Sequence, residues 1–329
     1  MKPQETEQLC AQIAAAGRQL QAVLKQRILG QDTAVEQICL ALLSGGHVLI
    51  EGAPGLGKTS LVQALAKAVD LSFRRVQFTP DLMPADILGA RVLETTVDGQ
   101  RGFRFLPGPI FTHVLLADEL NRATPRTQAA LLEAMAEGQV TSFGETHRLP
   151  EPFFVAATQN PIEMEGTYPL PEAQLDRFQL QIEIRMPGLD ALSALLELAP
   201  AENETLTPIF TRELLMQARQ LVREVPISSE LIALVARVLL ATHPADASSG
   251  PLVRRHLRHG ASPRGGLAIL AAARARALLR GRMHVTREDL DAVWHPALAH
   301  RVVAAFGAEP GGDAVRTALQ EAWQRGQLI

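Results

Sequence analysis

The segment that begins at residue 52 has the clearest chemical signature in the chain. It satisfies the pattern G-x-x-x-x-G-K-[ST], between an apolar run and an amphipathic stretch. Its residues are Gly52, Ala53, Pro54, Gly55, Leu56, Gly57, Lys58 and Thr59, and with Ser60 they form the predicted nucleotide-binding set. Glycines let the backbone curl so that N–H groups point at phosphate oxygens. We therefore expect Lys58 to contact the β and γ phosphates of a nucleotide and Thr59 to hold Mg²⁺.

Two carboxylates follow an apolar run further along the chain. Asp118 and Glu119 end the stretch that starts at His113, and parallel sheets present ligand-binding groups at the carboxyl ends of their strands. We expect Asp118 to support Mg²⁺ and Glu119 to polarise the water that attacks the γ-phosphate. GTPases more often orient this water with glutamine, so Glu119 favours ATP hydrolysis. In isolation, the same pair also occurs as a helix cap or a solvated turn.

A polar segment after another apolar run points to the same site. Residues 158–161 read Thr-Gln-Asn-Pro and follow the run that starts at Phe153. We expect the Asn160 amide to lie near the phosphate loop and to orient the attacking water. Taken alone, an asparagine before a proline is more often a turn former, so this assignment depends on the other two motifs.

Five short apolar runs supply the strands that must position these groups. The runs are residues 47–51, 73–78, 113–118, 153–158 and 178–184. They are bounded by turn residues, and most are separated from the next by enough residues for a crossover helix. This pattern predicts an α/β fold with a parallel sheet flanked by helices. Before the first run, apolar residues at helical spacing predict two helices separated at Gly30.

Two insertions interrupt this alternation, and each has the pattern of an exposed β-hairpin. Residues 91–105 contain Asp98-Gly99 between alternating stretches, which is a strong hairpin turn signal. Residues 139–149 have Gly144 at the centre of a similar pattern. The sequence therefore predicts two β-hairpin insertions in the α/β domain.

The strand-like runs stop after Met186-Pro187-Gly188, which we take as a domain boundary. We assign residues 1–187 to N-terminal helices and the nucleotide-binding α/β domain, and residues 188–329 to an all-α domain. The predicted helices of the second domain are residues 189–199, 212–224, 229–242, 265–280 and 287–294, and a last helix that contains Trp323.

The composition is that of an ordinary globular protein without an excess of positive charge. The 329 residues are 47% hydrophobic and 20% charged, and the formal net charge is −3. Proteins that neutralise nucleic acid phosphates normally have a strong basic excess, so nucleic acid is not an expected partner. Cys10 and Cys39 are the only cysteines, and their spacing supports neither a disulfide framework nor a zinc site. Without a signal-peptide pattern or an apolar stretch that could span a membrane, we expect a cytoplasmic location.

The densest basic cluster of the chain lies between residues 254 and 259. Its members are Arg254, Arg255, His256, Arg258 and His259. The cluster lacks the interleaved aromatic residues that stack on nucleic acid bases. We interpret it as a solvated face or a contact between subunits.

Longer motifs surround the groups described above. They are DELNRA at 118–123, QAALLEAM at 128–135, ATQNP at 157–161, EGTYPLPEAQLDRF at 165–178 and GASPR at 260–264. Together these motifs resemble the MoxR family of AAA+ ATPases. The resemblance extends from Ile28-Leu29-Gly30-Gln31 to at least Arg264, and the remaining helices fit the family's C-terminal α-helical lid.

The resemblance implies roles for three further residues. Asn160 would be the first sensor, Arg177 an arginine finger that reaches the γ-phosphate of a neighbouring subunit, and Arg264 the second sensor, facing either its own nucleotide or the neighbour's. A guanidinium is a forked, permanently charged donor, which suits the charge that spreads over phosphate oxygens. Without the resemblance, Arg177 reads as a surface salt-bridge residue and Arg264 as a charge at a helix start.

The resemblance also implies a Mg²⁺-dependent ATPase that assembles into a ring, hexameric by similarity. Family members are similar to maturation factors that remodel client complexes or insert metals with a von Willebrand A (VWA) domain partner. Both predicted hairpins fall where the family's branch of AAA+ proteins has insertions. ATP hydrolysis is then expected to move the lid and the hairpins against a client protein, which the sequence does not name.

Three alternative functions remain for comparison. A magnesium-chelatase motor subunit is close kin, but the strings at 118–135 and 165–178 look more like MoxR. A DNA-remodelling AAA+ ATPase predicts hairpins rich in Lys, Arg and aromatic residues, whereas the second hairpin has only Phe143, His147 and Arg148. A scaffold that binds ATP but barely hydrolyses it is expected to lack Glu119 or Arg177, and both are present.

Overall fold

A computed structural model of the chain describes residues 3–95, 101–142, 144–160, 166–197 and 207–328. Its centre is a five-stranded sheet with the order β2-β5-β8-β1-β9, in which all neighbouring strands are parallel. The strands are β1 (Val48–Glu51), β2 (Phe73–Gln77), β5 (Val114–Asp118), β8 (Phe154–Gln159) and β9 (Leu180–Glu183). They correspond to the five predicted runs, so the parallel sheet is confirmed.

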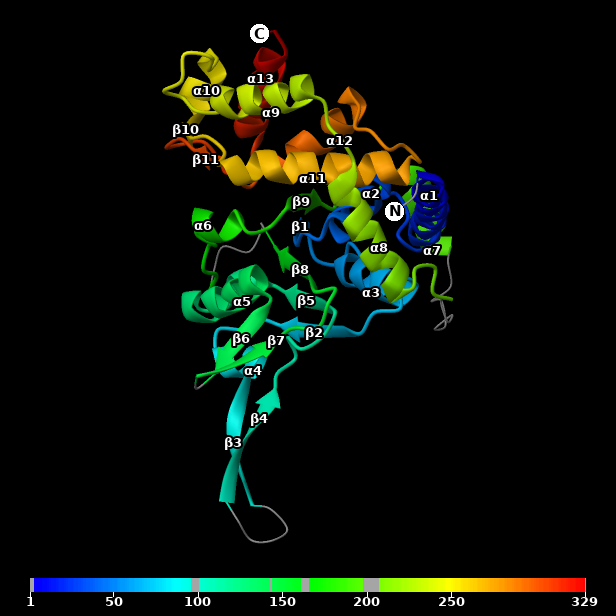
Figure 1. Cartoon of the computed structure of the whole chain (residues 1–329). Helices are drawn as coiled ribbons and strands as arrows, with labels where there is room; N and C mark the ends of the chain where they lie inside the picture. Colours follow the sequence, from blue (N-terminus) through cyan, green and yellow to red (C-terminus); the bar gives the residue numbers. More distant parts are fainter. Residues whose placement is uncertain (1–2, 96–100, 143, 161–165, 198–206, 329) are drawn as a thin grey trace.

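Helices cover both faces of this sheet (Figure 1). On one face lie α1 (Pro3–Arg27), α2 (Asp32–Ser44) and α3 (Lys58–Ala68), and on the other lie α4 (Pro84–Leu88) and α5 (Pro125–Glu137). Successive strand side chains point to opposite faces, so Val48 and Ile50 belong to the first core while Leu49 belongs to the second. This two-sided burial explains why the central strands are apolar without alternation.

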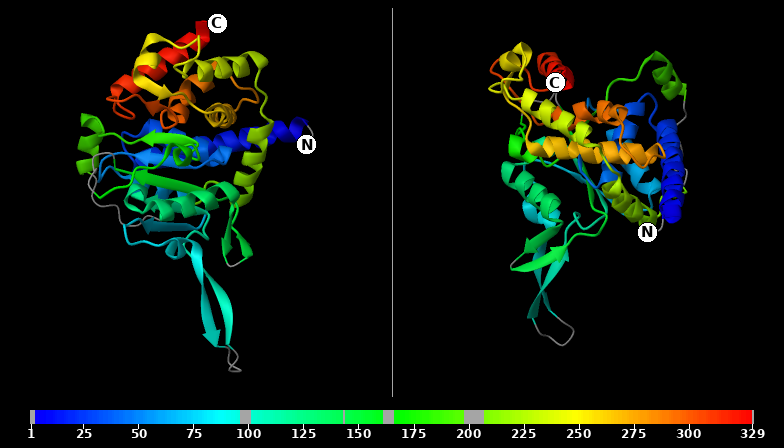
Figure 2. Two further views of the ribbon diagram at one scale, coloured as in Figure 1. Left: turned by 90° about the vertical axis from the view of Figure 1, so that its left-hand side faces the viewer. Right: turned by 45° about the horizontal axis from the view of Figure 1, so that its top comes forward.

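The two predicted hairpins are present as antiparallel ladders. The long hairpin consists of β3 (Gly89–Thr95) and β4 (Arg101–Pro107), and the short one of β6 (Gln139–Ser142) and β7 (Glu145–Arg148). The predicted Asp98-Gly99 turn lies outside the described residues. Gly144 has a φ of 83°, a left-handed conformation that favours glycine at a hairpin turn. The long hairpin projects from the body on the side opposite the C-terminal helices (Figures 1 and 2).

The C-terminal part is built mainly from helices, as expected. They are α7 (Leu189–Glu197), α8 (Arg212–Glu224), α9 (Ser229–Ala241), α10 (Pro251–His256), α11 (Pro263–Leu279), α12 (Arg287–Leu298) and α13 (Asp313–Leu328). Thr211, Ser228 and Ser262 cap the starts of α8, α9 and α11 with their side-chain oxygens. The helices are joined by a short ladder of β10 (Leu257–His259) and β11 (Val303–Ala304), which the sequence analysis did not predict.

The first hydrophobic core continues from the sheet into the C-terminal helices. It joins residues of α1, α2 and α3 to residues of α8, α9, α11, α12 and α13 in one cluster. Gly17 of α1 allows close packing here, because a Cβ at this position would lie 2.1 Å from a methyl carbon of Leu279 in α11. Within the described residues, no helix is long and apolar enough to cross a bilayer.

Candidate functional site

A cavity of about 340 Å³ lies at the carboxyl ends of β1, β5 and β8. It is lined by Pro54, Gly55, Gly57, Lys58, Thr59, Ser60, Arg75, Asp118, Glu119, Thr158, Gln159 and Asn160. Gly55 and Gly57 have φ values of 81° and 84°, which only glycine adopts readily. The predicted phosphate loop, both carboxylates and Asn160 are therefore brought together in one cavity, at the edge of the sheet where parallel strands present their ligands.

The phosphate loop leads from β1 into α3, which begins at Lys58. The Lys58 ammonium donates hydrogen bonds to the backbone oxygens of Gly52 (2.6 Å) and Ala53 (3.0 Å). These two residues and Leu56 do not line the cavity, and Leu56 packs against the first core instead. The ammonium and the N–H groups at the start of α3 offer positive charge to a phosphate.

Asp118, at the end of β5, is 6% exposed and is held on both carboxylate oxygens. The Thr158 hydroxyl donates to Oδ1 at 2.6 Å, and the Arg75 guanidinium donates to Oδ2 through Nε at 2.9 Å and Nη2 at 2.7 Å. Thr158 and Arg75 come from the two strands that flank β5. The neighbouring strands therefore fix the orientation of this carboxylate.

Glu119 follows directly and has an unusual backbone conformation. Its φ of 56° is left-handed, which is rare for a residue other than glycine and is found at functional sites. Gln77 Nε2 donates to Glu119 Oε2 at 2.6 Å, and Arg122 Nε lies 3.3 Å from the same oxygen. The Glu119 N–H donates to the Thr158 hydroxyl at 2.8 Å. The Glu119 carboxylate is thus held in the lining of the cavity, in a position suited to a general base.

The oxygen groups of this cavity fit a magnesium ion. Mg²⁺ prefers oxygen ligands and is usually held by one or two protein groups together with substrate phosphates and water. Thr59 and Asp118 supply one hydroxyl and one carboxylate beside the phosphate loop, and Arg75 occupies one oxygen of that carboxylate. No cluster of three or more His, Cys, Asp or Glu residues suited to a metal occurs among the residues that the structure describes. The cavity therefore suits a Mg²⁺ ion that binds together with a nucleotide.

Arg177 and Arg264 lie away from this cavity. Arg177 precedes β9, and the nearby Gln179 N–H bonds to the oxygen of His47, which precedes β1. Arg177 is therefore at the amino ends of the strands, and four to five residues of strand place it on the order of 15 Å from the phosphate loop. Its Nη1 donates to the Leu132 oxygen in α5 at 2.5 Å.

Arg264 lies beside Asp176, the residue that precedes Arg177. Its side chain is 62% exposed, and its Nε lies 3.8 Å from Asp176 Oδ2. The Asp176 carboxylate also accepts a hydrogen bond from the Ser262 hydroxyl at 2.9 Å. Arg177 and Arg264 are thus neighbours on one face of the molecule, while the other predicted site residues line the cavity or, like Gly52, Ala53 and Leu56, belong to the phosphate loop beside it.

Sequence reasoning missed four residues that hold the two carboxylates in place, namely Arg75, Gln77, Arg122 and Thr158. The sequence contains a signal for Arg75 and Gln77. Arg75 and Gln77 are polar residues two positions apart in β2, so they share one face of the strand, and the register places Gln77 opposite Asp118. The neighbour of that strand was not known from sequence, so the contact could not be predicted.

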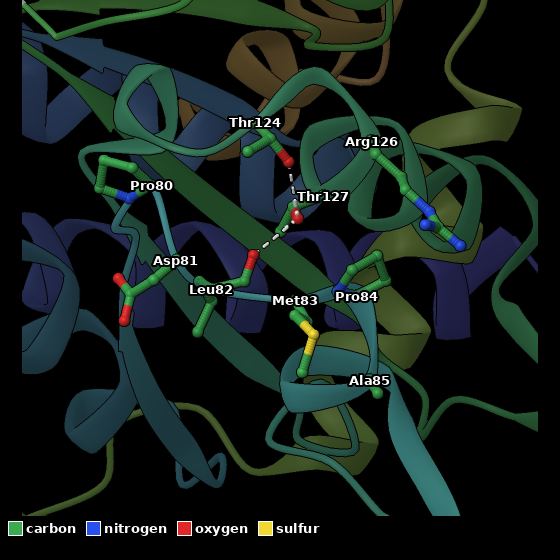
Figure 3. A pocket seen from close by; sticks show the side chains of 9 residues that line it. All are labelled: Pro80, Asp81, Leu82, Met83, Pro84, Ala85, Thr124, Arg126 and Thr127. Atoms are coloured by element: carbon green, nitrogen blue, oxygen red, sulfur yellow. Dashed lines mark hydrogen bonds between the residues drawn. The ribbon is translucent and has the colours of Figure 1, made fainter.

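A second cavity, of about 430 Å³, is separate from this site (Figure 3). It lies between residues 80–85, which follow β2, and the start of α5. The Thr127 hydroxyl closes its floor by donating to the Leu82 oxygen at 2.8 Å. None of the predicted site residues lines this cavity.

Comparisons with known proteins agree with this geometry. The model of the ATPase family associated with various cellular activities (AAA) matches residues 47–180, and the AAA lid domain matches residues 251–321. Chaperone MoxR1 of Mycobacterium tuberculosis is 40% identical over 93% of this chain and 80% of its own length. Protein MoxR of Paracoccus denitrificans is 32% identical over 93% of this chain and 94% of its own. A crystal structure of a presumed ATPase from Cytophaga hutchinsonii is similar with a TM-score of 0.89 and 32% identity, and the match covers 99% and 98% of the two chains.

The sheet, the phosphate loop, the paired carboxylates and the helical lid define a nucleotide-binding, ATP-hydrolysing P-loop ATPase of the AAA+ class. Within that class, the chain belongs to the MoxR family of AAA+ ATPases. This confirms the family expected from the motifs.

Proposed function

We propose that the protein is a Mg²⁺-dependent ATPase subunit whose active site is completed by a neighbouring copy. Lys58 and Thr59, with the phosphate loop, bind the nucleotide phosphates. Thr59 and Asp118 hold Mg²⁺, which would neutralise charge on the phosphate oxygens. Glu119 accepts a proton from the attacking water, and Asn160 orients that water. The neighbouring copy contributes Arg177 and Arg264.

One observation carries this proposal: the two arginines lie together on a face that is remote from the cavity of their own chain. The cavity is at the carboxyl ends of the strands, whereas Arg177 precedes β9 at their amino ends and Arg264 stands beside Asp176. A contact between the arginine face of one copy and the cavity of the next is head-to-tail, and such contacts close into rings when the rotation allows. For Arg264, this arrangement favours action on the neighbour's nucleotide.

We further propose that the ring is hexameric and that it remodels or matures a client complex, including by metal insertion, together with a VWA-domain partner. The chaperone naming of the MoxR1 relative and the projecting long hairpin support a role on other proteins. Val92, Leu93, Phe103 and Leu106 expose apolar surface along this hairpin, which suits contact with a protein client. We retain the predicted domain limits of 1–187 and 188–329 and the cytoplasmic location as parts of the proposal.

The test is ATP turnover as a function of protein concentration. Because the site needs two copies, we expect turnover per subunit to rise with concentration and then to level off. Arg177→Ala is expected to bind ATP with unchanged affinity and to lose about 10³-fold or more in kcat. Glu119→Gln is expected to bind ATP and to lose turnover as well, since glutamine cannot accept the proton.

Two results would contradict the proposal. Turnover per subunit that does not depend on concentration, together with an unimpaired Arg177→Ala, would mean that each chain has a self-contained site. Arg287→Ala is a matched control, because Arg287 is an arginine outside the proposed site whose ion pair, with Asp291, lies within α12. This control is expected to keep wild-type turnover.

A further inference from the structure

A buried arginine in the turn between α12 and β11 has an unusually complete set of partners. The side chain of Arg301 is only 3% exposed. It donates five hydrogen bonds, through Nε to Asp176 Oδ1 (2.9 Å), through Nη2 to the oxygens of Asp176 (3.2 Å) and Phe178 (2.5 Å), and through Nη1 to the oxygens of Gln179 (3.0 Å) and Ala297. A guanidinium has five N–H donors, so every one is used.

Four of these five bonds end on the segment that carries Arg177. Asp176 and Phe178 flank Arg177 in sequence, and Arg301 bonds to both of them. The adjacent His300 reinforces the contact, since its Nε2 donates to the Phe178 oxygen at 2.8 Å. The lid therefore holds the backbone on both sides of Arg177.

The other attachment of Arg177 is to the α/β domain. Its own guanidinium donates to the Leu132 oxygen of α5. The segment is thus fixed between a lid residue 125 positions away and a helix of the α/β domain. Gly265 permits this approach, because a Cβ there would meet Leu298 at 2.7 Å and the Cδ of Arg301 at 3.2 Å.

We propose that Arg301 is the positioning residue for Arg177, so that the lid of one subunit sets the reactivity of the site in the next. The inference rests on the proposed function, in which Arg177 acts on the neighbour's nucleotide. Arg301 touches no nucleotide itself, since it does not line the cavity. Its effect passes through the Asp176–Phe178 backbone to the place where the Arg177 guanidinium stands. A displacement of about 1 Å of a charged group costs on the order of 10²-fold in rate.

The first measurement is a separation of kcat from nucleotide binding. Arg301→Ala is expected to lower kcat about 10²-fold and to leave the Kd for a fluorescent ATP analogue unchanged. Arg301→Lys keeps the charge but cannot make five bonds, so we expect an intermediate kcat and a protein that folds if the alanine variant does not. A loss of nucleotide affinity in these variants would place the effect in the subunit's own cavity and overturn the inference. A wild-type kcat in the lysine variant would overturn it equally.

The decisive measurement mixes two inactive variants. An Arg301→Ala subunit has an intact cavity but a misplaced Arg177, whereas a Glu119→Gln subunit has an inert cavity and a well-placed Arg177. In an equimolar mixture, about a quarter of the contacts pair a competent cavity with a well-placed finger, so turnover is expected to reappear at about that fraction of the wild-type value. A purely structural defect in Arg301→Ala would not be rescued in this way.

A parallel mixture of Arg177→Ala with Glu119→Gln tests the underlying mechanism by itself. If both mixtures regain turnover, the inference stands. If only the Arg177→Ala mixture does, the neighbour's finger is real and the role of Arg301 is wrong. If neither does, the shared site fails and the inference about Arg301 fails with it. A mixture of Arg287→Ala with Glu119→Gln is the reference, because it gives the turnover of a fully active subunit diluted with an inactive one.

Discussion

Two buried histidines are held in the neutral form by the groups around them. His47 accepts a hydrogen bond at Nδ1 from the Val155 N–H (3.1 Å), so its Nε2 carries the proton that points to the Met135 oxygen (3.3 Å). Burial lowers the pKa of His47 to about 4 and the pKa of His300 to about 3. The Nδ1 of His300 has no hydrogen-bond partner among the residues that the structure describes, so a second proton there would be buried without compensation.

These pKa values predict a loss of stability in mild acid. The folded-state pKa lies below the ordinary value of about 6.5, so protons bind more readily to the unfolded chain. The contribution of each histidine is complete above pH 6.5 and decreases as the pH falls toward 4 for His47 and 3 for His300. Each should lower the free energy of unfolding by about 1.4 kcal/mol per pH unit in that window.

Urea unfolding at several pH values measures this slope. His300→Gln is expected to make the slope between pH 6 and pH 4.5 shallower by about 1.4 kcal/mol per pH unit. His259→Gln, which changes an exposed histidine, is the control substitution. An unchanged slope in the His300 variant would show that other groups cause the acid sensitivity.

At the scale of elements, the two hairpins form one assembly. The Phe105 ring of β4 stacks on the His147 ring of β7 with centroids 3.9 Å apart and planes at 8°, and Phe111 packs against both rings at their edges. Arg91 of the long hairpin also lies 3.7 Å from Glu145 of the short one. A displacement of the long hairpin would therefore be transmitted to the short hairpin, which precedes β8, the strand that ends at Gln159.

A double-mutant cycle measures this contact. Phe105→Ala and His147→Ala are expected to show a coupling of about 0.5–1.5 kcal/mol in the free energy of unfolding, because each substitution removes the same ring contact. Leu93→Ala with His147→Ala is the control pair, since Leu93 is an exposed residue on the same hairpin. Additive effects in the first pair would mean that the hairpins move independently.

The elements that could be predicted from sequence are those with a strong local pattern. The central strands are predictable because burial on both faces requires continuous apolar runs, and Gly144 marks a hairpin turn. The β10–β11 ladder is too short to leave a periodic pattern. The residues of the predicted phosphate loop are consecutive and could be located from sequence, whereas the contact of Arg75 with Asp118 depends on which strands are neighbours. The Arg301 contacts depend in the same way on how the lid docks.

For the whole molecule, an ion network links the lid to the N-terminal helices. Asp289 of α12 is fully buried and bonds to Arg276 (3.0 Å) and Arg282 (2.8 Å). Arg276 of α11 also bonds to Glu36 of α2 at 3.0 Å. Removal of the central carboxylate leaves two guanidinium groups, both largely shielded from solvent, without their shared partner.

Asp289→Ala is therefore expected to lower the free energy of unfolding by about 3–5 kcal/mol. Urea unfolding monitored by tryptophan fluorescence measures it, because Trp294 and Trp323 lie in the lid helices α12 and α13. Asp32→Ala is the control, because Asp32 pairs with Lys25 on the surface and is 72% exposed. It should cost less than about 1 kcal/mol. Equal effects of the two substitutions would show that the network is not a main source of stability.

The unbroken core between the N-terminal helices and the lid determines where the molecule can bend. A rotation of the lid about residues 186–188 would have to open apolar contacts of α11 with α1 and α2 and expose them to water. Such a hinge is stiff. Interfaces between separate domains or subunits commonly bury less apolar surface than a shared core, so in the proposed assembly we expect bending to occur between copies. The mechanical stroke would then be a change in the angle between whole subunits, each of which turns as a rigid body.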